Sequence, residues 1–276
     1  MTTIRHPPSA VRPVRIMGIV NVTPDSFSDG GRYFDAQAAI AHGLKLVEEG
    51  ADILDIGGES TRPGAEPVEE AEERARVLPV IEALAARAGV PLSIDTRKPA
   101  VARAAVKAGA AIWNDVSALT YAPDSLETAA ALDCRIVLMH AQGDPRIMQN
   151  NPRYDDVVGE VRAFLEARIE ACLAAGIDRA RLIVDPGIGF GKTVAHNLAL
   201  IAGLDRIAGL GRPVLLGVSR KRFIAALDRD GPADARLGGS LAAALEGWRR
   251  GAAILRVHDV AATRQALAVA RALFQA

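Results

Sequence analysis

Polar residues that could do chemistry follow seven of the eight short apolar runs in this sequence. They are Asn21, Asp95, Asn114 with Asp115, His140, Asp185, Ser219 to Lys221, and Arg256 with His258. Arg256 and His258 are two residues apart, so on a strand they would project from the same face and could bind one anion with two donors. A single polar strand end is unremarkable, but this many together indicate a functional site.

Glycine-rich segments follow the second and sixth of these runs, "DIGGESTRPGA" and "DPGIGFGKT". Glycine allows a positive φ and a close approach of backbone to ligand. "GFGKT" is similar to part of a phosphate-binding P-loop, but Pro186 stands where the first glycine of that motif is required, so an ATPase is excluded. "ESTRPG" offers a hydroxyl, a guanidinium and a rigid ring at Thr61, Arg62 and Pro63, which favours a loop that closes over a substrate.

The ligand types restrict the metals that the chain could hold. No HExxH motif and no cluster of Cys and His is present, which argues against a permanent zinc site. Asn21, Asp25 and Asp29 could instead share Mg²⁺ with a diphosphate, because that ion keeps most of its waters and takes few protein ligands. Cys134 and Cys172 have no CxxC partner, and we expect both to be buried free thiols.

The elements that must position these residues alternate regularly. The eight apolar runs are "VRIMGIVN", "ADILDIGG", "VPLSIDT", "AAIWNDV", "CRIVLMH", "RLIVDPG", "PVLLGVS" and "AAILRVHD", and a helix-like stretch follows each. Eight such units without a linker predict an α/β fold, a single (β/α)8 TIM barrel, with a doubly wound open sheet as the alternative. In the barrel, active sites gather at the C-terminal ends of the strands, where the polar residues lie.

Length and composition agree with one domain. The chain has 276 residues, half of them hydrophobic, and we expect an N-terminal tail at 1–13 and the barrel at 14–276. The segment "EPVEEAEERARVLPVIEAL" predicts one helix that bends at Pro79, with Glu70/Arg74 and Glu72/Arg76 paired four residues apart.

The charge balance limits the partners. Lys+Arg and Asp+Glu each number 33, so the net charge is zero and no basic field exists to attract nucleic acid or anionic lipid. The N-terminal residues lack the apolar core of a signal peptide, and no uncharged run reaches the ~18 residues of a membrane span. We therefore expect a cytoplasmic protein that binds small molecules, not nucleic acid or membranes.

Two long segments, "MGIVNVTPDSFSDGG" and "DILDIGGESTRPGA", resemble the signatures of the dihydropteroate synthase family of bacterial folate synthesis. "SIDT", "WNDVSAL", "DPGIGFGKT", "GVSRKRFI", "RLGGSL" and "ILRVHD" resemble its other conserved blocks in the same order, over about residues 14–275. The resemblance implies condensation of 6-hydroxymethyl-7,8-dihydropterin diphosphate with p-aminobenzoate to give 7,8-dihydropteroate and pyrophosphate.

The resemblance also implies a pterin site. Asp185 would accept two N–H bonds from the 2-amino-4-oxopyrimidine edge, as a buried carboxylate can. Asn114 would bond the ring nitrogens, Asp95 would accept from the reduced ring, and Lys221 would donate to the 4-oxo or N5 side. Gly217 and Phe190 complete this predicted set.

The other two predicted subsites involve the loops. The diphosphate would lie over Arg256, His258 and Asn21, with Mg²⁺ held at Asn21. The p-aminobenzoate ring would rest among Phe27, Pro63, Phe190 and the stem of Lys221, near Thr61 and Arg62. Its carboxylate would meet the start of the helix after Ser219, where this chain has Arg222 in place of the serine of many relatives. The predicted catalytic set is Asn21, Asp29, Thr61, Arg62, Lys221, Arg256 and His258.

The expected reaction is dissociative, with no protein nucleophile, and loops 22–31 and 60–64 would close to exclude water. Alternatives are a pterin barrel that transfers a methyl group to a corrinoid protein, which would not need the two loop signatures, and a non-catalytic homologue. An aldolase-like Schiff base at Lys221 is a third, disfavoured by the neighbouring Arg220 and Arg222. The resemblance further suggests a homodimer through outer helices and a pocket in which sulfonamides would compete.

Overall fold

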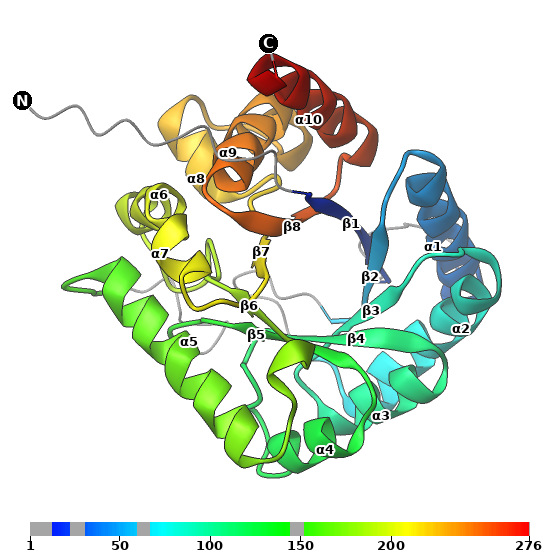
Figure 1. The fold of residues 1–276 in the computed structure, drawn as a ribbon. Helices are drawn as coiled ribbons and strands as arrows, with labels where there is room; N and C mark the ends of the chain where they lie inside the picture. The colour runs from blue at the N-terminus through cyan, green and yellow to red at the C-terminus, as the bar shows by residue number, and fades with distance from the viewer. Residues whose placement is uncertain (1–12, 23–30, 60–66, 144–151, 276) are drawn as a thin grey trace, which may run out of the picture.

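The computed structural model describes residues 13–22, 31–59, 67–143 and 152–275, and these form one closed barrel of parallel strands (Figure 1). The strands are β1 (Arg15–Asn21), β2 (Ile53–Gly57), β3 (Leu92–Asp95), β4 (Ala110–Asp115), β5 (Arg135–Met139), β6 (Leu182–Asp185), β7 (Val214–Leu216) and β8 (Ala252–Val257). Each strand pairs with the next along the chain, and β8 pairs with β1. The predicted TIM barrel is confirmed, and the open-sheet alternative is wrong.

Helices surround the barrel on its outside (Figure 1). They are α1 (Gly31–Glu48), α2 (Glu70–Arg87), α3 (Pro99–Lys107), α4 (Ser125–Ala131), α5 (Val157–Ala174), α6 (Val194–Ala202), α7 (Leu204–Ala208), α8 (Arg222–Leu227), α9 (Leu237–Arg249) and α10 (Val260–Gln275), with 3-10 turns at Arg179–Arg181 and Ala233–Arg236. As predicted, α2 runs through Pro79 as one helix, and Arg76 pairs with Glu72. None of the described helices is both long and apolar enough to cross a membrane.

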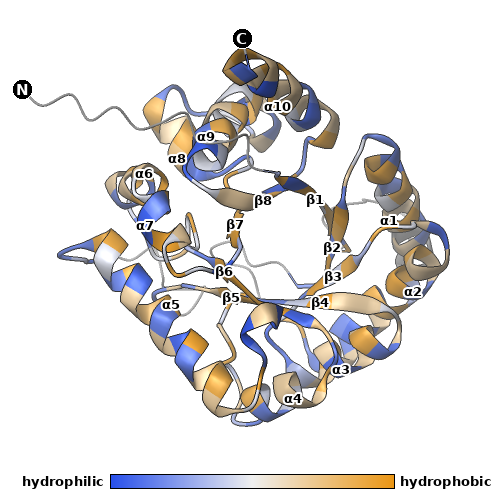
Figure 2. Ribbon diagram, in the orientation of Figure 1, coloured by the Kyte–Doolittle hydropathy of each residue, from blue (hydrophilic) through white to orange (hydrophobic). Residues whose placement is uncertain are grey.

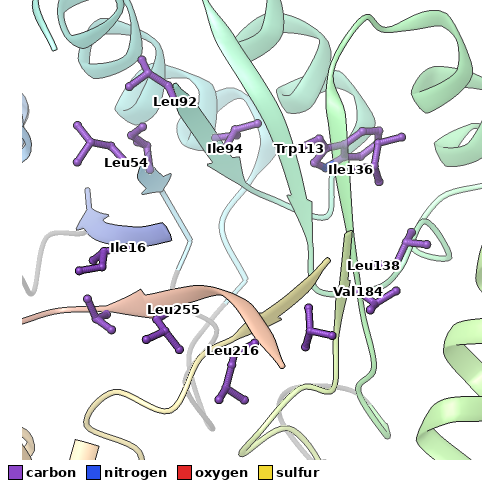
Figure 3. Close-up of a cluster of buried hydrophobic side chains, with 14 of the residues drawn as sticks. Ile16, Leu54, Leu92, Ile94, Trp113, Ile136, Leu138, Val184, Leu216 and Leu255 are labelled. Carbon is purple, nitrogen blue, oxygen red and sulfur yellow. The ribbon is translucent and has the colours of Figure 1, made fainter. Parts of the chain in front are cut away.

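The strands bury both faces, and this explains their continuous apolar runs. Outward-facing residues such as Leu54, Ile94 and Leu216 pack against the helices and form the larger core (Figure 3). Figure 2 shows the matching pattern, with mostly hydrophobic strands inside helices that carry hydrophilic residues. A second, smaller cluster fills the barrel's interior: Met17, Ile53, Ile112, Val137, Ile183, Leu215 and Ile254.

The alternation of inward-facing and outward-facing side chains along the strands also positions the site. Because side chains alternate along a strand, the next inward-facing position lies two residues after each interior apolar residue, toward the C-terminal end of the strand. On several strands this position is polar. These positions hold Asp55, Asn114, Asp185 and Arg256, and Gly217 takes the same place after β7. One end of the barrel is therefore plugged by apolar side chains, and the other presents acids, an amide and a guanidinium.

Some details differ from the prediction. Strand β7 ends at Leu216, so Ser219 to Lys221 lie in the following turn and not at the strand end. Arg220 adopts a left-handed φ of 58° there, and its guanidinium is bound by Asp259 at 2.6 and 3.0 Å. Cys134 precedes β5 by one residue, but both cysteines are buried and unbonded as predicted. Most of the predicted N-terminal tail lies outside the described residues.

Candidate active site at the C-terminal end of the barrel

Arg256 of β8 is bound by two carboxylates inside the barrel. Its Nε lies 2.6 Å from Asp55 Oδ2 on β2, and its Nη2 lies 2.7 Å from Asp95 Oδ2 on β3. The Asn114 amide donates to the same Asp55 oxygen at 3.1 Å. This network joins four strands, and the Oδ1 atoms of Asp55 and Asp95 are buried without a hydrogen-bond partner. A ligand with N–H groups could satisfy such oxygens.

Asp55 was missed by the sequence analysis. It lies in the middle of β2 and its side chain is fully buried. The available signal was an acid at an inward position of an otherwise apolar strand, because a buried acid requires a partner. The partner could not be identified in advance, since Arg256 is 201 residues away.

The register of the strands links three predicted residues on neighbouring strands. Asn21 pairs with Gly57, Gly57 with Asp95, and Asp95 with Asn114. Gly57 contributes no side chain between Asn21 and Asp95, which leaves room there. The structure thus places Asn21, Asp95 and Asn114 at the end of the barrel where active sites of this fold occur, and Arg256 reaches them through its contact with Asp95.

Burial favours the neutral forms of Asp95, Asp185 and Lys221. Desolvation raises the pKa of Asp95 to about 7, against the opposing effect of Arg256, and it raises the pKa of Asp185 to about 6. Burial and the charge of Arg256 lower the pKa of Lys221 to about 8. Such shifts cluster in functional sites, because groups that are costly to bury are retained there for their chemistry.

Asp185 ends β6 and is held by the turn that follows it. Its Oδ1 accepts the N–H of Gly187 at 2.7 Å, and its side chain is buried. The turn depends on glycine, because Gly187, Gly189 and Gly191 all have a positive φ, between 61° and 84°. The carboxylate is fixed in direction before any ligand arrives.

Lys192 fastens this turn to the end of β5 and was also missed. Its buried Nζ lies 2.9 Å from the Phe190 carbonyl oxygen, 3.3 Å from that of His140 and 3.0 Å from His140 Nδ1. Burial lowers the pKa of Lys192 to about 7, and burial together with Lys192 lowers that of His140 to about 3. The "GK" of "GFGKT" therefore has a structural role: Lys192 holds the turn after β6 against the end of β5, and His140 is part of this contact.

Lys221 and Phe190 form one wall of the site. Lys221 immediately precedes α8, and its Nζ lies 4.2 Å from the centroid of the Phe190 ring. Gly189 approaches the Lys221 stem so closely that an added Cβ would lie 3.2 Å from Cδ. The structure confirms that Lys221 and Phe190 adjoin, whereas Arg222 is exposed at the start of α8.

His258 and Asp115 are each held by hydrogen bonds to residues in turns. His258 lies just beyond β8, with its Nδ1 2.9 Å from Ser219 Oγ. A shared anion between His258 and Arg256 stays a prediction. Two of the Arg256 N–H groups are bonded to the Asp55 and Asp95 carboxylates. Asp115 accepts from the Ser117 N–H and hydroxyl and from the Leu119 N–H, and so it stabilises the turn after β4.

Several predicted residues lie outside the described part of the chain: Asp25, Phe27, Asp29, Thr61, Arg62 and Pro63. Within the described part, no three His, Cys, Asp or Glu side chains are grouped to hold a metal ion. Asn21 offers one oxygen ligand at the rim, which suits Mg²⁺ if a substrate supplies further oxygens. Among the described residues, Asn21 fits such a shared ion.

A glycine variant tests the turn that holds Asp185. In Gly187→Ala, the new Cβ would overlap the backbone oxygen of His140, and φ is +68°. We expect the free energy of unfolding to fall by about 2 kcal/mol or more, because the strained φ alone costs roughly 1–2 kcal/mol. Chemical denaturation measures this.

The control is Gly176→Ala, which has a similar φ of +82° but no atom within 4 Å of the added Cβ. It carries the strain without the overlap, so it should lose only about 1 kcal/mol. Equal losses in the two variants would show that the turn does not pack against His140 as described.

Comparisons with known proteins place the site in context. The family model described as "Pterin binding enzyme" matches residues 17–258. The dihydropteroate synthase of Haemophilus influenzae is 50% identical over 255 residues, which are 92% of this chain and 92% of the relative.

Two solved structures of the Xanthomonas albilineans dihydropteroate synthase are similar along nearly the whole chain. The structure with 4-aminobenzoic acid has a TM-score of 0.90 and 56% identity, covering 95% of this chain and 94% of that one. The structure with 7,8-dihydropteroate has a TM-score of 0.87 and 53% identity, covering 96% and 95%. The similarity therefore includes the strands that carry the site.

Proposed function

Because the chain belongs to the dihydropteroate synthases, a family of pterin-binding transferases, we propose that it condenses 6-hydroxymethyl-7,8-dihydropterin diphosphate with p-aminobenzoate. The products are 7,8-dihydropteroate and pyrophosphate. The observation that carries the proposal is the set of Asp95, Asn114, Asp185 and Lys221 around Arg256 at the open end of the barrel. The structures of the Xanthomonas albilineans relative with 4-aminobenzoic acid and with 7,8-dihydropteroate support the same substrate classes.

The pterin ring would bind across this set. Ionised Asp185 accepts two N–H bonds from the pyrimidine edge, and its direction is already set by the Gly187 N–H. Asn114 can both donate and accept at the ring nitrogens. The unpartnered Oδ1 of Asp95 is available for an N–H of the reduced ring. These roles explain why buried acids persist here at a cost in desolvation.

The diphosphate would lie toward Asn21, Arg256 and His258. Asn21 would hold Mg²⁺ together with diphosphate oxygens, and the bound ion supplies neutralisation of the negative charge on the leaving group. Burial alone would disfavour the charged form of Arg256, but the Asp55 and Asp95 carboxylates outweigh burial and raise the pKa of the guanidinium. Arg256 therefore contributes a cation to the site. The guanidinium stays charged throughout the reaction and stabilises the developing anion.

The bond from the pterin methylene carbon to the diphosphate oxygen would break first. The electron pair leaves with pyrophosphate, and the resulting cation is delocalised into the electron-rich reduced ring. The amine of p-aminobenzoate then forms the C–N bond and loses a proton. The chain orients the two substrates and excludes water, which would otherwise capture the cation.

The p-aminobenzoate ring would lie on the wall made by Phe190 and the Lys221 stem. The predicted contacts from Phe27, Thr61, Arg62 and Pro63 belong to residues outside the described part of the chain. The apolar ring and the adjacent cation suit an aromatic carboxylate, since the ring can stack and the charge is attracted. We propose this wall as the fixed side of the second subsite.

The function is tested by supplying both substrates and Mg²⁺ to the purified protein and identifying the product by chromatography and mass. We expect 7,8-dihydropteroate only when the pterin diphosphate, p-aminobenzoate and Mg²⁺ are all present. A folded protein that binds the pterin and forms no dihydropteroate would instead support the non-catalytic homologue.

The pH dependence of pterin binding follows from the shifted groups. Asp185 and Asp95 must be ionised to accept N–H bonds, so affinity should rise as pH passes about 6 and about 7. Lys221 must be protonated to donate, so affinity should fall above about 8. We therefore expect tightest binding between about pH 7 and 8.

The ligand for this measurement is 6-hydroxymethyl-7,8-dihydropterin, because it has no phosphate to titrate. Its Kd is followed by calorimetry from pH 5 to 9.5. An affinity that does not change over this range would contradict the assignment of these three groups to the pterin site.

A homodimer is a further part of the proposal. Val269, Leu273 and Phe274 of α10 are apolar and exposed on the barrel's outer wall, away from the site. Burial of such residues between two copies is a common way to stabilise a dimer. Sedimentation equilibrium should give twice the chain mass, and Leu273→Glu should shift the mass toward one chain. A single-chain mass for the wild type would contradict this arrangement.

A further inference from the structure

Two segments at the C-terminal end of the barrel are joined by side-chain contacts. The turn after β7 carries Ser219, Arg220 and Lys221, and the residues just beyond β8 are His258 and Asp259. Arg220 donates to Asp259 twice, from Nε to Oδ2 at 3.0 Å and from Nη2 to Oδ1 at 2.6 Å. We refer to the pair of Arg220 and Asp259 as the clamp.

A second contact lies directly beside the clamp. The Oγ atom of Ser219 lies 2.9 Å from His258 Nδ1, and it accepts the backbone N–H of His258 at 3.2 Å. One hydroxyl therefore holds both the ring and the backbone of His258. Because Ser219 immediately precedes Arg220, and His258 immediately precedes Asp259, the clamp keeps these two residues in contact.

The backbone of Arg220 is strained at the clamp. Its φ is 58°, a left-handed conformation that residues other than glycine rarely adopt. Ser240 Oγ accepts its backbone N–H at 2.8 Å, Arg236 donates to its carbonyl oxygen at 3.0 Å, and Asp259 binds its guanidinium. Strain of this kind persists where the surrounding structure imposes it, and it clusters in functional sites. Glycine would relieve the strain, so an arginine here indicates that the side chain is needed.

The geometry of the clamp suits it to fix orientation. The side chains of Arg220 and Asp259 are 30% and 22% exposed, so the pair is largely sheltered from water. The hydrogen bond with Asp259 raises the pKa of Arg220, although burial opposes this. A bidentate pair between arginine and a carboxylate restricts the relative orientation of its two partners. The clamp therefore prevents the two segments from moving independently.

We propose that Arg220 is a positioning residue for the diphosphate of the first substrate, because the clamp holds Ser219 against His258. The inference rests on the proposed function, in which the diphosphate lies toward His258. Arg220 acts through Asp259 and Ser219, and it needs no contact of its own with a substrate.

The first test is Asp259→Asn, which separates positioning from charge. The amide keeps one acceptor oxygen but cannot accept from both Arg220 N–H groups, so the clamp is broken. We expect the Kd for inorganic pyrophosphate with Mg²⁺, measured by calorimetry, to rise about tenfold or more, because small misplacements of binding groups are costly. Loss of a negative charge by itself would strengthen anion binding. An unchanged or lower Kd would therefore overturn the inference.

The pterin site is the internal reference for this measurement. Lys221 adjoins Arg220 but is held separately, with its Nζ 4.2 Å from the centroid of the Phe190 ring and its stem close to Gly189. In Asp259→Asn, the Kd for 6-hydroxymethyl-7,8-dihydropterin, which has no diphosphate, should stay within about twofold of the wild type. Equal losses in the two Kd values would indicate a merely structural role and would overturn the inference.

Two variants of Arg220 separate positioning from stability. Both remove the guanidinium, but glycine adopts a φ of 58° freely, whereas alanine keeps the strain. Arg220→Gly should therefore melt at a higher temperature than Arg220→Ala, while both variants raise the pyrophosphate Kd to a similar extent. A Kd that returns to the wild-type value in Arg220→Gly would overturn the inference.

The matched control is Arg206→Ala on α7. Arg206 pairs with Asp156 at 3.3 Å, and both side chains are exposed on the outside of the barrel. This variant also removes an arginine from an ion pair with an aspartate, but it breaks no contact in the site. Both Kd values should equal those of the wild type.

Hydrogen exchange separates this inference from the proposed function. The His258 amide donates to Ser219 Oγ, so it should exchange faster in Asp259→Asn than in the wild type, whatever reaction the protein catalyses. Unchanged exchange would overturn the positioning role. A wild-type protein that forms no dihydropteroate would instead overturn the proposed function, and that result is obtained before any variant is compared.

Discussion

Replacement of Arg256 by methionine should lower the free energy of unfolding by about 3–5 kcal/mol at pH 8 and abolish measurable turnover. The substitution leaves Asp55 and Asp95 buried without their cation, and breaking a buried pair by removing one partner costs about this much. Turnover should fail because the same guanidinium stabilises the leaving diphosphate. The measurements are urea denaturation and initial rates.

The pH dependence of this loss identifies its cause. Without Arg256, the folded-state pKa of Asp95 should rise further above its ordinary value, since Arg256 is what opposes desolvation. A carboxyl whose pKa is raised on folding favours the native state when protonated, and this benefit is lost as pH rises through the folded pKa. The deficit should therefore be smaller at pH 5 than at pH 8.

The control is Arg162→Met on α5, where the arginine pairs with Glu166 four residues on and both side chains are exposed. An exposed pair of this kind contributes little, so the loss should be below about 0.5 kcal/mol. Similar losses in the two variants, or a deficit in Arg256→Met that does not vary with pH, would contradict the role given to the buried network.

Asp185→Asn should separate activity from stability. The amide is nearly isosteric and can still accept the Gly187 N–H, but it replaces a charged acceptor for two pterin N–H groups. Hydrogen bonds to a charged group contribute about 1.5–3 kcal/mol each, or about 3–6 kcal/mol for the two. Because the amide oxygen remains as a neutral acceptor, we expect a loss in the lower half of this range, about 3–4 kcal/mol. At about 1.4 kcal/mol per factor of ten, kcat/KM for the pterin diphosphate should fall about 10²- to 10³-fold.

The stability of Asp185→Asn should not fall along with its activity. Desolvation raises the pKa of Asp185, which means that the ionised carboxylate is a cost to the folded state at neutral pH. The neutral amide removes this cost, so the melting temperature should be equal or higher. Asp115→Asn should give the opposite result, because the two Asp115 oxygens each accept an N–H, from Ser117 and from Leu119, and an amide can replace only one of these acceptors. It should lower stability and leave kcat/KM near the wild-type value.

The fold could be predicted because parallel strands buried on both faces give distinctive apolar runs. Polar residues at the ends of those runs could be identified for the same reason, since Asn21, Asp95, Asn114 and Asp185 interrupt an otherwise apolar pattern. Arg256 was also found in this way. What the pattern could not supply was the partner of each residue, because neighbours across the barrel are far apart in the chain.

The residues that were missed show where such reasoning stops. Asp55 lies within a strand, and only the closed barrel brings it to Arg256. Lys192 joins the turn after β6 to the end of β5, through hydrogen bonds to backbone oxygens that a sequence does not locate. The short β7 could not be anticipated either, because the chain leaves the sheet at Gly217 and turns at Arg220, where contacts with Asp259 and Ser240 decide the path.

The proposed reaction is tested most directly by the release of pyrophosphate from the pterin diphosphate by the wild-type protein with Mg²⁺, with and without p-aminobenzoate. We expect p-aminobenzoate to accelerate release and one pyrophosphate to appear for each dihydropteroate formed. Release that is unaffected by p-aminobenzoate and yields no dihydropteroate, from protein shown to be folded and to bind the pterin, would contradict it.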